Sequence, residues 1–146
     1  MVSILFTLVA AALCVSGCEL EDRKQQASVA VAAFVDDVRT KRFERAYQRT
    51  SADYRQAASA AEFERAIAAN VYWQEATGFR SEVVTQLGAG RYKVSGVLLS
   101  GGEVAATADV VFEGKSPKVA GFASPAEPLL PSPRAPASPP SDPGNR

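Results

Sequence analysis

Carboxylates and tyrosines are the residues of this 146-residue chain that could transfer protons. Histidine is absent from the sequence, so the commonest general base near neutral pH and the commonest transition-metal ligand are missing. An acid–base site would have to combine a carboxylate with a tyrosine, and only a buried carboxylate would favour that role. The candidates are the carboxylates Asp36, Asp37, Glu82 and Asp109 and the tyrosines Tyr47, Tyr54, Tyr72 and Tyr92.

The sequence nevertheless favours solvent-exposed positions for the three aspartates. Asp36 and Asp37 are expected on the solvated face of a helix, where Asp37 precedes Lys41 by four residues, a favourable spacing for an ion pair. Asp109 alternates with apolar neighbours and is expected on the open face of a sheet. We therefore predict no catalytic residue and no cofactor, and no metal site because metal-ligating residues do not cluster.

Two adjacent aromatic residues could bind an apolar ligand. Tyr72 and Trp73 follow a predicted helix end and precede the predicted sheet. Such a pair either plugs a hydrophobic core or lines a pocket, and we expect the plug. Phe34 and Tyr47, on the inward stripes of two earlier helices, are expected to close the same region.

A basic stripe lies on the second predicted helix. Arg42, Arg45 and Arg49 recur at helical spacing. The stripe is either an ordinary solvated face or a contact for anionic lipid headgroups or wall polymers. Nucleic acid is not expected as a partner, because the chain has 16 basic and 16 acidic residues and hence no net charge.

The N-terminal residues predict export. No charged residue occurs from Met1 through Gly17, and charged residues follow Cys18 at once. The apolar run from Val2 to Val15 matches the core of an export signal and is shorter than the about 20 residues that span a bilayer. No lysine or arginine precedes this run, in contrast to the usual signal peptide.

The four residues Val15-Ser16-Gly17-Cys18 resemble the lipobox of bacterial lipoproteins. The resemblance implies removal of a signal peptide, residues 1–17, and acylation of Cys18. It places the protein in the cell envelope, on the extracytoplasmic side of a bacterial membrane. Glu19 after the cysteine resembles the outer-membrane sorting pattern, which in a Gram-negative host implies the periplasmic face of the outer membrane. An uncleaved anchor or ordinary secretion are the alternatives.

Composition divides the rest of the chain into a linker, one domain and a tail. Residues 18–26 are polar, and residues 27–124 form one domain without disulfides, because Cys14 would be removed and Cys18 acylated. Eight prolines follow Ser124, and we expect residues 125–146 to be a disordered tail without strands. The tail could also bind a proline-recognising partner or act as a strut, with Leu129 and Leu130 as the residues that could dock.

The hydrophobic period changes once along the domain, from helical to alternating spacing. The first helix carries an apolar stripe of Val31, Phe34, Val35 and Val38, and a shorter helix begins at Phe43. Ser59 and Glu62 form a capping-box pattern that opens a third helix, which Asn70 ends. Glycine-containing turns then separate four strands, at about 79–87, 91–100, 103–113 and 118–123.

This arrangement predicts an α+β fold with three helices on a curved four-stranded antiparallel meander. It resembles the cone-shaped domain named after nuclear transport factor 2 (NTF2-like) over about residues 27–123. The motifs that carry the resemblance are Val31-x-x-Phe34-Val35, Phe43-x-x-Ala46-Tyr47 and Ser59-x-x-Glu62-Phe63.

The sequence thus predicts a membrane-anchored envelope lipoprotein with a non-catalytic binding domain. Its partners would be the membrane, through the lipid, and an envelope protein or a small apolar ligand. The alternative is a small enzyme of the cone type, an isomerase or dehydratase, with a buried carboxylate and a tyrosine.

Overall fold

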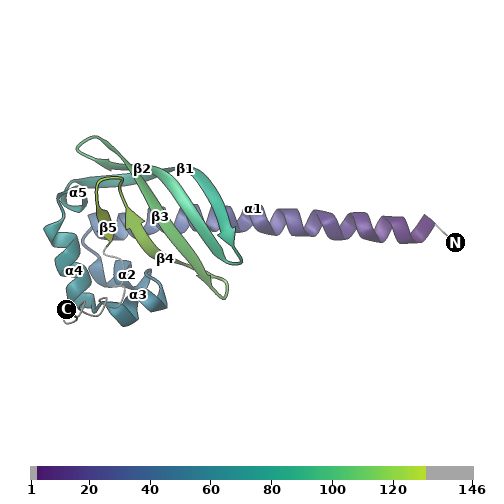
Figure 1. Cartoon of the computed structure of the whole chain (residues 1–146), viewed down its shortest axis with the longest axis horizontal. Coiled ribbons are helices and arrows are strands. Elements are labelled where there is room, and N and C mark those ends of the chain that lie inside the picture. Colours follow the sequence, from purple (N-terminus) through teal and green to yellow (C-terminus); the bar gives the residue numbers. More distant parts are fainter. Residues whose placement is uncertain (1–2, 131–146) are drawn as a thin grey trace, which may run out of the picture.

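Helices pack on an open antiparallel sheet in this protein, as expected for the α+β class (Figure 1). The structure is a computed structural model that describes residues 3–130, with side chains from residue 17 onward. The helices of the described part are α1 Ser3–Arg39, α2 Phe43–Gln48, α3 Ala52–Ala57, α4 Ala60–Ala69 and α5 Val71–Gln74. Its strands are β1 Ala76–Gly88, β2 Arg91–Ser100, β3 Glu103–Glu113, β4 Ser116–Ala123 and β5 Pro128–Leu130, paired in this order.

The structure therefore corrects the expectation of three helices and four strands. Helices α3 and α5 are additional, with six and four residues. Each begins at a side-chain cap: Ser51 accepts a hydrogen bond from the amide of Tyr54, and Asn70 accepts one from the amide of Tyr72. Both elements span fewer than two helical turns, and neither carries an apolar stripe long enough for the sequence pattern to indicate it.

Strand β5 lies where a tail without strands was expected. The hydroxyl of Ser124 accepts a hydrogen bond from the amide of Glu127, and the chain then pairs with β4, Phe122 opposite Leu130. Pro128 opens the strand at the edge of the sheet, a position that tolerates a missing ladder donor. Leu129 and Leu130 are 1% and 2% exposed. Residues 131–146, the rest of the expected tail, lie outside the described residues.

The apolar stripe of α1 is buried as predicted, and it anchors the core. Phe34 is fully buried, with its ring centroid 6.2 Å from that of Phe63, 5.9 Å from that of Trp73 and 6.3 Å from that of Phe122 on β4. Val94 and Val110 are buried in the same core. Aromatic side chains therefore fill the space between the helices and the sheet.

Helix α1 is continuous through residues 18–26, the expected linker. Leu20 packs against the core and Ala27 is fully buried. The helix ends where Lys41 adopts a positive φ of 59°. Within residues 3–130, no helix is both long enough and apolar enough to cross a membrane.

Candidate functional site

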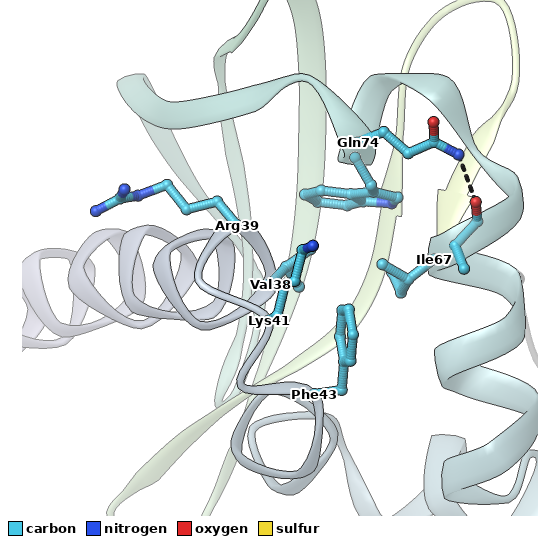
Figure 2. Close-up of a pocket in the computed structure, with 8 residues that line it drawn as sticks. Val38, Arg39, Lys41, Phe43, Ile67 and Gln74 are labelled. Atoms are coloured by element: carbon cyan, nitrogen blue, oxygen red, sulfur yellow. Dashed lines mark hydrogen bonds between the residues drawn. The ribbon is translucent and has the colours of Figure 1, made fainter.

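A pocket of about 490 Å³ opens where α1 ends, between that helix and the α4–α5 pair (Figure 2). Its size falls in the range of small-molecule sites. Residues from α1, the α1–α2 connection, α2, α4 and α5 line it: Val38, Arg39, Lys41, Phe43, Ile67, Ala68, Trp73 and Gln74.

The wall of this pocket is largely apolar, and hydrogen bonds hold its side chains in place. Trp73 is 3% exposed, and its Nε1 donates a hydrogen bond to the carbonyl oxygen of Leu129 at 2.6 Å. Its ring makes edge-on contacts with Phe34 and Phe122. Gln74 Nε2 donates to the carbonyl oxygen of Ala68 at 2.5 Å, which joins α5 to α4 (Figure 2). The wall is therefore formed before any ligand arrives.

One cationic side chain of the pocket rim has no anionic partner among the described residues. Arg39 is directed away from the other labelled side chains in Figure 2, and its guanidinium pairs with Asp36 at 2.6 Å. Lys41 forms no ion pair within residues 17–130. The pocket thus combines an apolar wall with an ammonium group that can contact an anion.

The aromatic residues predicted as plug or pocket separate into different roles. Trp73 lines the pocket, and Phe34 lies behind it in the core. Tyr47 lies outside the lining, and its hydroxyl donates to the carbonyl oxygen of Ala58 at 2.8 Å. Tyr72 is half-buried, and its carbonyl oxygen accepts a hydrogen bond from Ser100.

Sequence reasoning missed most of the pocket lining. Val38, Phe43 and Ile67 lie on the predicted apolar stripes of three different helices, so their pattern indicated core. Lys41 was expected only as an ion-pair partner of Asp37 on a solvated helix face. The missing information is tertiary: residues from different helices line this pocket together, and no local pattern encodes that arrangement.

The basic stripe of α2 converges on Asp37, which is 1% exposed. Arg42 Nε donates to Asp37 Oδ1 at 2.8 Å, and Arg49 Nε donates to Asp37 Oδ2 at 2.6 Å. Arg45 Nε lies 3.8 Å from Oδ1. The expectation that Asp37 is solvated and pairs with Lys41 is therefore wrong, because the turn after α1 folds α2 back over this carboxylate.

Opposing effects set the pKa of Asp37. Burial raises it, but the hydrogen bond from Arg49 and the charges of Arg49, Arg45 and Arg42 outweigh burial and hold the pKa below its ordinary value of 3.8. The carboxylate is therefore ionised at neutral pH, and it is bound by arginines. Asp36, at the same helix end, has a side chain that is 43% exposed.

Asp37→Asn should destabilise the domain by about 2 kcal/mol, because the two arginines lose their buried acceptor charge. Because folding lowers the pKa of Asp37, its ionised carboxylate stabilises the folded state at pH values above the unfolded-state pKa. This stabilisation is lost as the pH falls through the folded-state pKa. The difference between Asp37→Asn and the parent, measured by urea unfolding, should therefore shrink in acid. Asp36→Asn is the matched control and should cost less than about 1 kcal/mol, because its ion pairs are exposed.

The other proton-transfer candidates do not come together. Within residues 17–130, no tyrosine hydroxyl is hydrogen bonded to a carboxylate. The hydroxyl of Tyr54 is buried without a protein partner, and burial is the main cause that raises its pKa to about 12. Asp109 is exposed, as expected, and so is Glu82.

Neither a protein-family model nor a curated protein matches the chain. Function must therefore be inferred from the pocket, from the arginine-bound carboxylate and from the position of Cys18. Cys18 is exposed on α1, two residues before Leu20, which packs against the core.

Proposed function

We propose that this protein is an envelope lipoprotein, anchored through Cys18, whose domain binds a small amphipathic anion without transforming it. The pocket beside Trp73 carries this proposal, because it joins a preformed apolar wall to the ammonium of Lys41, which has no ion-pair partner within residues 17–130. We also propose that the domain is NTF2-like. The packing of the helices on an open antiparallel sheet supports this assignment.

The ligand class follows from the two parts of the pocket. Val38, Phe43 and Ile67 together with Trp73 would cover an acyl chain or an aromatic ring, since burial of apolar surface drives such binding. Lys41 would contact a carboxylate or a phosphate at the rim, where a charge-assisted hydrogen bond fixes orientation. A small apolar molecule with one anionic end meets both conditions.

The arrangement of acidic groups supports binding over catalysis. Asp37 is the one buried carboxylate among residues 17–130, and both of its oxygens accept hydrogen bonds from arginines. An isomerase or dehydratase of the cone type would need a carboxylate that is free to take a proton beside a tyrosine. No such pair occurs in the described part of the chain, so no observation favours the enzyme.

Binding can be followed through Trp73, since the chain contains one tryptophan. Titration with octanoate should give a saturable change in tryptophan emission, because the acyl chain would lie against the indole. Lys41→Asn should weaken octanoate binding about fivefold and leave binding of neutral octanol unchanged, because only the ion contact is lost. Asparagine tolerates the positive φ of this position.

Lys115→Asn serves as the matched control, an exposed lysine distant from the pocket lining. It should leave octanoate binding at the parent value. A tryptophan spectrum that does not respond to octanoate, or an equal loss of octanoate and octanol binding in Lys41→Asn, would show that the pocket does not select an amphipathic anion. A protein partner would then be the remaining binding mode.

A further inference from the structure

We infer that the anchored domain rests on its bilayer through one end of the sheet, made of the β1–β2 and β3–β4 turns. Leu87, Arg91 and Lys115 would lie at the surface of an anionic membrane. This inference rests on the proposed acylation of Cys18, because the acyl chains fix where the bilayer begins.

No flexible spacer separates Cys18 from the folded domain. Helix α1 continues without interruption from Cys18 into the core. Leu20 already packs against the core, and the guanidinium carbon of Arg23 lies 5.4 Å from the ring centroid of Phe112 on β3. Acyl chains on Cys18 would therefore hold the domain itself at the membrane.

The same contacts place the anchor beside one end of the sheet. With a rise of about 1.5 Å per helical residue, Cys18 and Arg23 are separated by about 8 Å along the helix axis. Phe112, under Arg23, donates its amide hydrogen to the carbonyl oxygen of Gly90 in the β1–β2 turn at 2.8 Å. Figure 1 shows α1 projecting from the side of the domain where β1 and β3 end.

This end of the sheet has the chemistry of a peripheral membrane contact. Leu87, next to the β1–β2 turn, is 52% exposed and is the largest of the exposed apolar side chains among the described residues. Arg91 and Lys115 are exposed and form no ion pair within the described residues. Basic residues beside an apolar side chain suit an anionic headgroup layer, which attracts the charges and receives the leucine.

The acidic residues on this stretch of α1 have partners within the helix. Glu19 pairs with Arg23 at 3.4 Å, and Glu21 pairs with Lys24 at 2.9 Å. Asp22 accepts a hydrogen bond from Gln26. These contacts reduce the repulsion that the acidic groups of α1 would have with an anionic surface. Glu113, next to the β3–β4 turn, accepts a hydrogen bond from the amide of Ala52. Arg91 and Lys115 are the basic residues of these two turns, and neither forms an ion pair within the described residues.

The opposite end of the domain lies far from the anchor. Val38, in the pocket, follows Cys18 by 20 residues, or about 30 Å along α1. The arginines of α2 come after that point and two of them are bonded to Asp37. The pocket would thus face the aqueous side of the envelope, and the α2 stripe would not contact the same bilayer.

Site-directed spin labelling of the full lipidated protein tests this orientation. In the mature chain Cys18 would be acylated, so a cysteine introduced by Ala89→Cys or Gly102→Cys would be the one free thiol. Both residues are exposed, Ala89 in the β1–β2 turn and Gly102 between β2 and β3. In phosphatidylethanolamine–phosphatidylglycerol vesicles, a nitroxide at position 89 should be shielded from a water-soluble paramagnetic chelate, and a nitroxide at position 102 should be fully accessible.

Charge removal gives a second, graded measurement. Arg91→Gln combined with Lys115→Gln should lower the ratio of docked to undocked domain about 25-fold, because each basic residue near an anionic surface contributes about fivefold. Lys41→Asn combined with Arg65→Gln, two basic residues toward the other end, should leave position 89 shielded.

The outcomes separate the orientation from the anchor. The protein could sediment with the vesicles while nitroxides at positions 89 and 102 are equally accessible to the chelate. This result would overturn the orientation but would be consistent with the lipid anchor. Protein that stays in the supernatant with a free Cys18 thiol would overturn the anchor, and the orientation with it.

Discussion

Truncation after Ser124 should destabilise the domain by about 5 kcal/mol, most of the stability of a small domain. The deleted residues include Leu129 and Leu130, both almost fully buried, and strand β5 with them. Loss of each leucine costs about 2–5 kcal/mol, and the indole of Trp73 also loses its acceptor, the carbonyl oxygen of Leu129.

The matched control is truncation after Leu130, which retains the whole of β5. Urea unfolding of both proteins gives the contribution of residues 125–130 to the free energy of unfolding, because the two chains differ by this segment alone. The shorter protein should be largely unfolded in buffer and the longer one folded. Equal unfolding midpoints would restore the sequence-based expectation that the chain after Ser124 contributes nothing to the fold.

Phe34→Ala should cost about 3–5 kcal/mol through lost burial and the cavity left behind. Phe34 has no exposed surface, and three aromatic rings from α4, α5 and β4 surround it. The substitution therefore opens a void at the point where the helices meet the sheet. Chemical denaturation followed by far-ultraviolet circular dichroism measures the loss.

Asp36→Ala, two residues along the same helix, is the control for Phe34→Ala. Its carboxylate forms exposed ion pairs with Arg39 and Arg42, each worth less than about 1 kcal/mol. We expect nearly unchanged stability. If Asp36→Ala destabilised the protein as much as Phe34→Ala, the register of α1 would have to be rotated.

The sequence predicted those elements whose signals are local. The spacing of Val31, Phe34, Val35 and Val38 predicted the buried stripe of α1, and all four are buried. The capping box of Ser59 and Glu62 forms as predicted. Glycine turns also located the hairpins, because positive φ at Gly90, Gly101 and Gly114 is a local requirement.

The features that were missed depend on contacts between distant residues. Leu129 and Leu130 lie in a proline-rich segment, and their burial follows from pairing with β4 and from the indole of Trp73. The sequence around Asp37 does not indicate burial, because Arg49, which binds its carboxylate, lies twelve residues later in the chain. Composition alone therefore indicated a disordered tail and a solvated helix face.

The candidate site was predicted even less completely than the fold. Trp73 was singled out because adjacent aromatics after a helix end are unusual, and it does line the pocket. Lys41 gains its role from a positive φ at the end of α1 and from the absence of an ion-pair partner in the described residues. Neither property is written in the local sequence.

The proposed acylation of Cys18 underlies both the proposed function and the inferred bilayer contact. Intact-mass spectrometry of the protein extracted from its host membranes tests it most directly. The mature chain should begin at Cys18 and carry the mass of a diacylglyceryl group on that residue. A mature chain that retains residues 1–17, or that begins at Cys18 with an unmodified thiol, would contradict the lipid anchor.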